Sequence, residues 1–90
     1  MKKIEFYIIE IKIAELDGDY YEYVTGIEVN SNGFIIVNTS NDPLNAIRFN
    51  TWGVNNKSEN KLREQYINMV RNYFPKKNYQ ISYKFVTVTL

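Results

Sequence analysis

The apolar pattern of the first long β-segment, residues 3–16, changes phase midway. Its apolar positions are first Ile4, Phe6 and Ile8, and then Ile9, Ile11 and Ile13. Successive side chains of a strand point to opposite faces, so this segment requires either a β-bulge or burial on both faces. Residues 78–90 repeat the change: Tyr79, Ile81, Tyr83 and Phe85 are followed by Val86, Val88 and Leu90. We therefore expect these two segments to be neighbouring strands, with Lys84 meeting acids of the first strand.

Turn chemistry predicts how the first strand connects to the second. Leu16-Asp17-Gly18 is typical of a three-residue hairpin loop, with Gly18 at the position that needs a positive φ. The resulting register pairs Glu15 with Asp19, Ile13 with Tyr21, Lys12 with Glu22 and Ile11 with Tyr23. It predicts that Tyr21 and Tyr23 share the face of the later isoleucines, whereas Tyr20 lies on the other, more exposed face.

A second hairpin follows at residues 30–33, Asn-Ser-Asn-Gly, where Asn-Gly is a strong turn signal. The third strand is predicted at Phe34–Thr39. Its first four residues are apolar on both faces, which favours a central, covered strand. A short helical turn is expected next, capped by Asn41 or Asp42, with Pro43 at its first position. Ala46 and Phe49 are predicted on one side of it, and either this turn or a second copy of the chain covers the second apolar face.

The one long helix is predicted at Glu59–Phe74, capped by Ser58 and ended by Pro75. Helical spacing assigns its buried stripe to Leu62, Tyr66, Met69, Val70 and Tyr73. The order of elements is β-β-β, short turn, α, β. This order favours a single α+β domain spanning residues 1–90: a four-stranded antiparallel sheet with one amphipathic helix packed on one face.

Composition argues against catalysis. The chain has no Cys and no His, so disulfides, thiolate metal sites and the commonest general base are missing. It contains no nucleophile elbow, P-loop or dinucleotide-binding motif. Asp17-Gly18-Asp19 could begin a calcium loop, but Tyr20-Tyr21 follows where further ligands are needed, which favours a hairpin turn. We expect no enzyme activity, cofactor or metal. Without a visible signal peptide or membrane span, we also expect a soluble cytoplasmic protein.

The charges are divided between the two halves of the chain. Residues 1–45 carry three lysines and eight acids, whereas residues 46–90 carry eight basic residues and two acids. Fields of one sign steer charged partners, so this division favours a binding protein. Glu10, Glu22 and Glu28 are predicted on one side of the first two strands. They can be interpreted as a solvated face, an acidic binding face or, less simply, an acid–base pair. The predicted partner-binding residues are Glu10, Asp17, Asp19, Tyr20, Glu22, Glu28 and Trp52.

The basic half supports an alternative interpretation. Its helix, the following loop and the last strand could form a phosphate-contacting patch with stacking tyrosines. The predicted residues are Lys61, Arg63, Arg71, Lys76, Lys77 and Lys84. Against this, the net charge is only +1 and the arginines could be the solvated face of an amphipathic helix. Trp52 could equally anchor a partner or close an open edge of the core.

Residues 39–49, Thr-Ser-Asn-Asp-Pro-Leu-Asn-Ala-Ile-Arg-Phe, follow a tyrosine-rich strand pair. This stretch resembles a pattern in small open reading frames of phages and mobile elements of AT-rich Gram-positive bacteria. In general character the chain resembles phage anti-defence proteins, including anti-CRISPR inhibitors. The resemblance implies a non-enzymatic inhibitor of a host protein such as a nucleic-acid-handling defence nuclease, acting in the host cytoplasm. The alternatives are a small nucleic-acid-binding regulatory protein and a self-associating homodimer.

Overall fold

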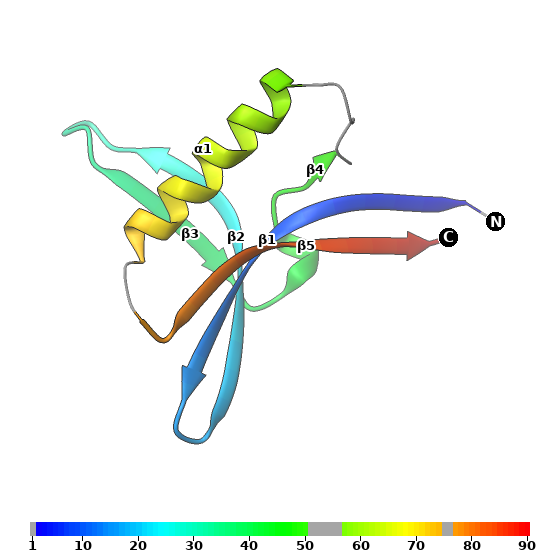
Figure 1. Ribbon diagram of the computed structural model, residues 1–90, viewed down its shortest axis with the longest axis horizontal. Coiled ribbons are helices and arrows are strands. Elements are labelled where there is room, and N and C mark those ends of the chain that lie inside the picture. Colours follow the sequence, from blue (N-terminus) through cyan, green and yellow to red (C-terminus); the bar gives the residue numbers. More distant parts are fainter. Residues whose placement is uncertain (1, 51–56, 75–76) are drawn as a thin grey trace.

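The computed structural model describes residues 2–50, 57–74 and 77–90. It contains an antiparallel sheet crossed on one face by a single helix (Figure 1). The predicted α+β class is confirmed. The elements are β1 (Lys3–Glu15), β2 (Gly18–Val29), β3 (Ile35–Ser40), the 3₁₀ turn η1 (Pro43–Asn45), β4 (Phe49–Asn50), α1 (Lys57–Tyr73) and β5 (Tyr79–Thr89).

Strand β1 organises the sheet because it pairs along both of its edges. One edge binds β4 through Phe6 and Tyr7 and then β2 from Glu10 onward, giving the order β3-β2-β1-β4. The other edge pairs with β5 over almost its whole length, from Lys3 opposite Thr89 to Ile13 opposite Tyr79. The first and last strands are therefore neighbours, as their matching patterns predict.

The phase change in β1 marks the point where the buried side chains of the strand move from one face of the sheet to the other. Ile8 and Ile9 are both fully buried, although they point to opposite faces. The β1–β5 register runs through this point without interruption. Burial on both faces is therefore confirmed for β1, and the β-bulge alternative is wrong. A register shift does occur in this sheet, but between Val24 and Gly26 of β2.

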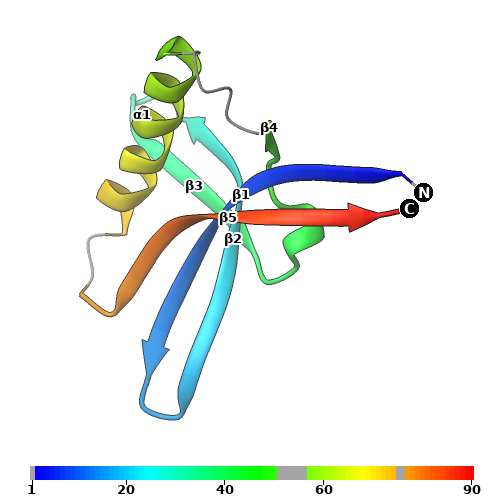
Figure 2. The ribbon, with the colours of Figure 1, turned by 45° about the vertical axis from the view of Figure 1, so that its right-hand side comes forward.

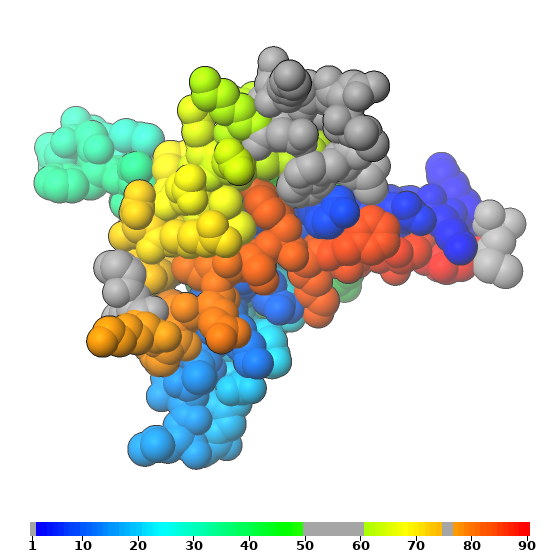
Figure 3. Space-filling model, in the orientation of Figure 1, coloured from blue at the N-terminus to red at the C-terminus, as the bar shows by residue number. Residues whose placement is uncertain are grey.

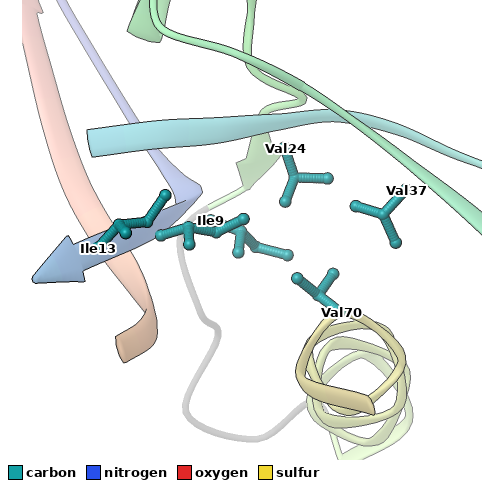
Figure 4. Close-up of a cluster of buried hydrophobic side chains, with 6 residues drawn as sticks. Ile9, Ile13, Val24, Val37 and Val70 are labelled. Carbon is teal, nitrogen blue, oxygen red and sulfur yellow. The ribbon is translucent and has the colours of Figure 1, made fainter. Parts of the chain in front are cut away.

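The larger core lies between the sheet and α1 (Figure 4). Its buried members are Ile9, Ile11, Ile13, Val24, Val37 and Val70. Phe49 closes one side of this core, with its ring centroid 5.2 Å from that of Tyr66 on the helix and 5.4 Å from that of Tyr83 on β5.

The smaller core lies on the opposite face, where Phe6, Ile8, Tyr23 and Ala46 are buried together. The segment after η1 supplies Ala46, so the short turn covers the second apolar face, one of the two covers expected from the sequence. Asp42 caps this turn, accepting a 2.9 Å hydrogen bond from the Leu44 amide. The prediction that Ala46 and Phe49 lie on one side is wrong, since they belong to the two different cores.

The helix buries a stripe that matches the predicted one only in part. Val70 is buried and Tyr66 packs against the larger core, as predicted. Leu62 and Tyr73 are exposed, whereas Arg63 and Ile67 are buried. The helix begins at Lys57, so Ser58 lies within it instead of capping it, and the predicted stop at Pro75 lies outside the described residues. Strand β3 also differs from prediction. It forms the edge of the sheet and starts with the exposed Ile35.

Candidate functional site

The first hairpin has a different register from the predicted one. Glu15 pairs with Gly18, so the turn consists of Leu16 and Asp17 alone. A one-residue slip turns every side chain of a strand to the other face. Tyr23 consequently enters the smaller core, and Tyr21, predicted in the larger core, is exposed.

The tip of this hairpin projects from the body of the molecule (Figure 3). We define the hairpin tip as Glu15, Leu16, Asp17, Asp19 and Tyr20. Leu16 is fully exposed, and the three carboxylates around it are exposed as well. Turn positions normally carry polar residues, so a large apolar side chain here is unusual. Leu16 and Glu15 were missed as candidate site residues, although a leucine next to Asp-Gly was a usable signal.

Two contacts fix side chains of the hairpin tip. The Tyr20 hydroxyl donates a 2.6 Å hydrogen bond to Asp17 Oδ2. This bond raises the pKa of Tyr20 because it stabilises the protonated phenol beside a carboxylate. Lys12 Nζ lies 3.5 Å from Asp19 Oδ2 and offsets part of the negative charge. Lys12 thus pairs with Asp19, and the predicted Lys12–Glu22 pair is wrong. The tip presents an apolar side chain, a half-exposed aromatic ring and carboxylates together.

The three glutamates expected on one face do not form one surface. Glu10 pairs with Lys84 across the β1–β5 seam, at 3.2 Å between Oε2 and Nζ. Glu22 lies opposite Ile11, on the face of the larger core, and accepts a 3.3 Å hydrogen bond from the Thr39 hydroxyl. Glu28 is exposed far along β2, opposite Ile36. The prediction of a shared glutamate face is wrong.

The predicted basic patch is also dispersed. Arg63 is buried, with 6% of its surface exposed, and its backbone carbonyl accepts a 2.7 Å hydrogen bond from the Tyr83 hydroxyl. Arg71 donates a 3.1 Å hydrogen bond to the carbonyl of Ile81. Lys84 is engaged with Glu10. Lys61 and Lys77 are exposed. Lys76 lies outside the described residues, and so does Trp52, one of the predicted partner-binding residues.

No family model, curated protein or solved structure matches this chain. Within residues 2–50, 57–74 and 77–90, no helix has the length and apolar character needed to cross a membrane. In the same described part of the chain, no three His, Cys, Asp or Glu side chains are grouped to hold a metal ion. The hairpin tip is the candidate site because its apolar, aromatic and acidic side chains are exposed together.

Proposed function

We propose that this chain is a non-enzymatic binding protein that inhibits a larger protein by placing its hairpin tip on a basic surface of that protein. The observation that carries the proposal is the fully exposed Leu16 between the carboxylates of Glu15 and Asp17. An apolar side chain gains free energy when a partner covers it, and carboxylates select a basic surface around it.

Tyr20 supports the same interpretation. Its ring is half exposed, and its hydroxyl is held by Asp17. A tyrosine with a fixed ring loses little conformational freedom on binding, which is why tyrosine is common in binding surfaces. Burial of the Tyr20 ring next to Leu16 would give the interface an apolar centre with an acidic rim.

The basic surfaces most in keeping with this tip are those that proteins use to hold nucleic acid, because their phosphate contacts require clustered Lys and Arg. Carboxylates on a projecting hairpin can occupy such a groove in place of phosphates. The likeness in character to phage anti-defence proteins extends the proposal to a CRISPR or other defence nuclease, inhibited in the host cytoplasm. Nucleic-acid binding by the chain itself has less support, because Arg63 is buried and Lys84 is paired.

A transformation assay tests the inhibitory function. The chain is expressed in bacteria that carry one of a panel of defence nucleases, and plasmid survival is measured. We expect survival to rise with at least one nuclease and to fall back for the double variant Glu15→Lys, Asp17→Lys. The control is Glu64→Lys, which makes the same kind of charge change at an exposed helix position. Equal survival with the double variant and the wild type would contradict the role of the hairpin tip.

A gel-shift experiment separates the two functional interpretations. The alternative predicts salt-dependent DNA or RNA binding that weakens for Lys61→Glu. Our proposal predicts no shift of nucleic acid at low salt and no effect of Lys61→Glu on plasmid survival. A salt-sensitive shift that Lys61→Glu abolishes would favour the basic half instead.

A further inference from the structure

The outer edge of β5 is open in the described part of the chain, where β5 pairs with β1 alone. The N-terminal half of β1 and the C-terminal half of β5 pair with each other in an arm that leads away from the helix, and β4 adds only a short pairing to it at Phe6 and Tyr7 (Figures 1 and 2). We define this arm as residues 3–8 and 84–89. Outside the β4 pairing, the arm has two strands in the described part of the chain. A two-stranded ribbon is at best marginally stable in water, so this part of the arm gains from a further strand.

The direction of the backbone groups along β5 follows from the hydrogen bonds at its two ends. The Leu90 amide donates to the Lys2 carbonyl at 2.8 Å, and the Ala14 amide donates to the Asn78 carbonyl at 3.0 Å. The register between these bonds is unbroken, so even-numbered residues of β5 bond to β1. The odd-numbered residues direct their N–H and C=O groups outward. In the arm these are Phe85, Thr87 and Thr89.

The two halves of this edge are protected differently. Near the helix, the outward carbonyl of Ile81 is capped by the Arg71 side chain at 3.1 Å. Beyond Lys84 the sequence reads Phe-Val-Thr-Val-Thr-Leu, with no charge, proline or glycine. Natural edge strands are usually protected from pairing by charges, prolines or bulges. Residues 85–90 lack all three and have high β-propensity, so this half of the edge is suited to pairing.

We propose that a second copy of the chain pairs with this edge, β5 against β5, antiparallel and centred on Thr87. In this register Thr87 faces Thr87 of the second copy, and Phe85 faces Thr89 of the second copy. All three are residues whose backbone groups point outward, so each N–H finds a carbonyl. The pairing extends the sheet across a two-fold axis, and because both copies use the same edge, the assembly closes as a dimer.

Side-chain complementarity favours a second copy over an unrelated strand. Val86 meets Val88 of the second copy on the face of the smaller core, against which Val86 and Val88 already pack in each chain. The pairing therefore joins two small cores into one apolar layer. On the other face, Phe85 is 47% exposed beside Tyr7 and becomes covered by Thr89 of the second copy. Lys84 falls opposite Leu90 of the second copy, so no like charges meet.

The variant Thr87→Pro tests the dimer with little effect on the fold of one chain. Proline removes the amide of Thr87, which points outward, and leaves the amides that bond to β1 intact. Light scattering coupled to gel filtration should give twice the 10.7 kDa chain mass for the wild type and for Thr87→Ala, and the single-chain mass for Thr87→Pro. Circular dichroism confirms that each variant is folded. A wild type that stays monomeric up to about 1 mM, or a folded Thr87→Pro dimer, would overturn the proposal.

Substitutions of opposite charge at Thr87 test the register of the β5–β5 pairing. Thr87→Glu places two glutamates opposite each other at the two-fold axis, next to Glu5, which already faces Thr87 within each chain. This variant should be monomeric at concentrations where the wild type is a dimer. Mixing it with Thr87→Lys should restore the dimer mass as a heterodimer. If the glutamate variant alone dimerises like the wild type, or the mixture stays monomeric, pairing about Thr87 is wrong.

Discussion

Lys84 and Glu10 form an ion pair, 3.2 Å apart, across the seam between the last and the first strand. Their hydrogen bond raises the pKa of Lys84 because it stabilises the charged ammonium. The pair joins the basic and the acidic halves of the chain, as expected from the sequence. Part of the charge division is therefore internal pairing.

Removal of this pair should reduce stability slightly. Lys84 is half exposed, so Glu10→Gln is expected to lower the free energy of unfolding by about 0.5 kcal/mol, within the range of exposed ion pairs. Urea denaturation at low salt measures the loss, which should shrink at about 1 M salt because screening weakens the pair. A double-mutant cycle with Lys84→Met should give a coupling of similar size. A coupling of zero at low salt would mean that the pair contributes nothing in solution.

Tyr83 should make stability fall in alkaline solution. Burial raises its pKa to about 12, against an ordinary value of 10.0, so the folded chain retains the phenolic proton that the unfolded chain has lost. The stabilising contribution is complete below pH 10 and is lost as the pH rises toward 12. Absorbance titration should detect a tyrosine ionisation step near 12. Tyr83→Phe should remove that step and cost about 1 kcal/mol, because the hydrogen bond to the Arg63 carbonyl is lost.

The Lys84 pKa is also raised, so Lys84 loses its charge in the same alkaline range. The Tyr83→Phe variant distinguishes the two groups, since the lysine contribution to the pH dependence remains. A pH–stability curve that is identical for the wild type and Tyr83→Phe would contradict the assignment to Tyr83.

Because β1 is buried on both faces at Ile8 and Ile9, these two adjacent residues should both contribute strongly to stability. Ile8→Ala and Ile9→Ala should each lower the free energy of unfolding by about 2–5 kcal/mol, because each leaves a cavity in a different core. Denaturant unfolding measures both. A strand with one buried face and one wet face would instead show a large loss at one position and almost none at the other.

Substitutions on the buried and the exposed face of α1 should also differ in their effect on stability. Ile67→Ala is expected to cost about 2–5 kcal/mol, because the side chain is buried. Leu62→Ala, at a position 65% exposed, should change stability by less than about 0.5 kcal/mol. A large loss at Leu62 would restore the stripe expected from the sequence and contradict the observed rotation of the helix.

Sequence patterns predicted the first and the last strand well because their apolar phase was clear. The seam between β1 and β5 and the Lys84–Glu10 contact both follow from that phase. The hairpin register was harder to predict because β2 reads Asp-Tyr-Tyr-Glu-Tyr-Val from Asp19, which is amphipathic on both faces. The predicted loop agreed with an odd-numbered apolar phase at Tyr21, Tyr23, Ile27 and Val29, but the register shift between Val24 and Gly26 breaks that phase. The agreement was therefore misleading, and a loop one residue too long moved Tyr21 and Tyr23 to the wrong faces.

The buried face of the helix was predicted incorrectly for a related reason. Arg63 was assigned to the polar face by its charge, and Leu62 to the buried face by its apolar side chain. In the structure Arg63 is buried, its carbonyl binds Tyr83 of β5, and Leu62 faces outward. Such tertiary contacts override the helical pattern and cannot be derived from it. Leu16 lies in the turn in both the predicted and the observed register, so its exposure could have been predicted from the sequence.

Site-specific photo-crosslinking tests the central claim most directly. A benzophenone amino acid replaces Leu16 in one variant and Leu62 in a control, both exposed leucines. Each variant is irradiated in a lysate of an AT-rich Gram-positive bacterium. We predict a crosslink to one basic protein at position 16 and none at 62, with competition by excess wild type but not by the Glu15→Lys, Asp17→Lys variant. Equal crosslinking at both positions, or equal competition by that variant, would contradict binding through the hairpin tip.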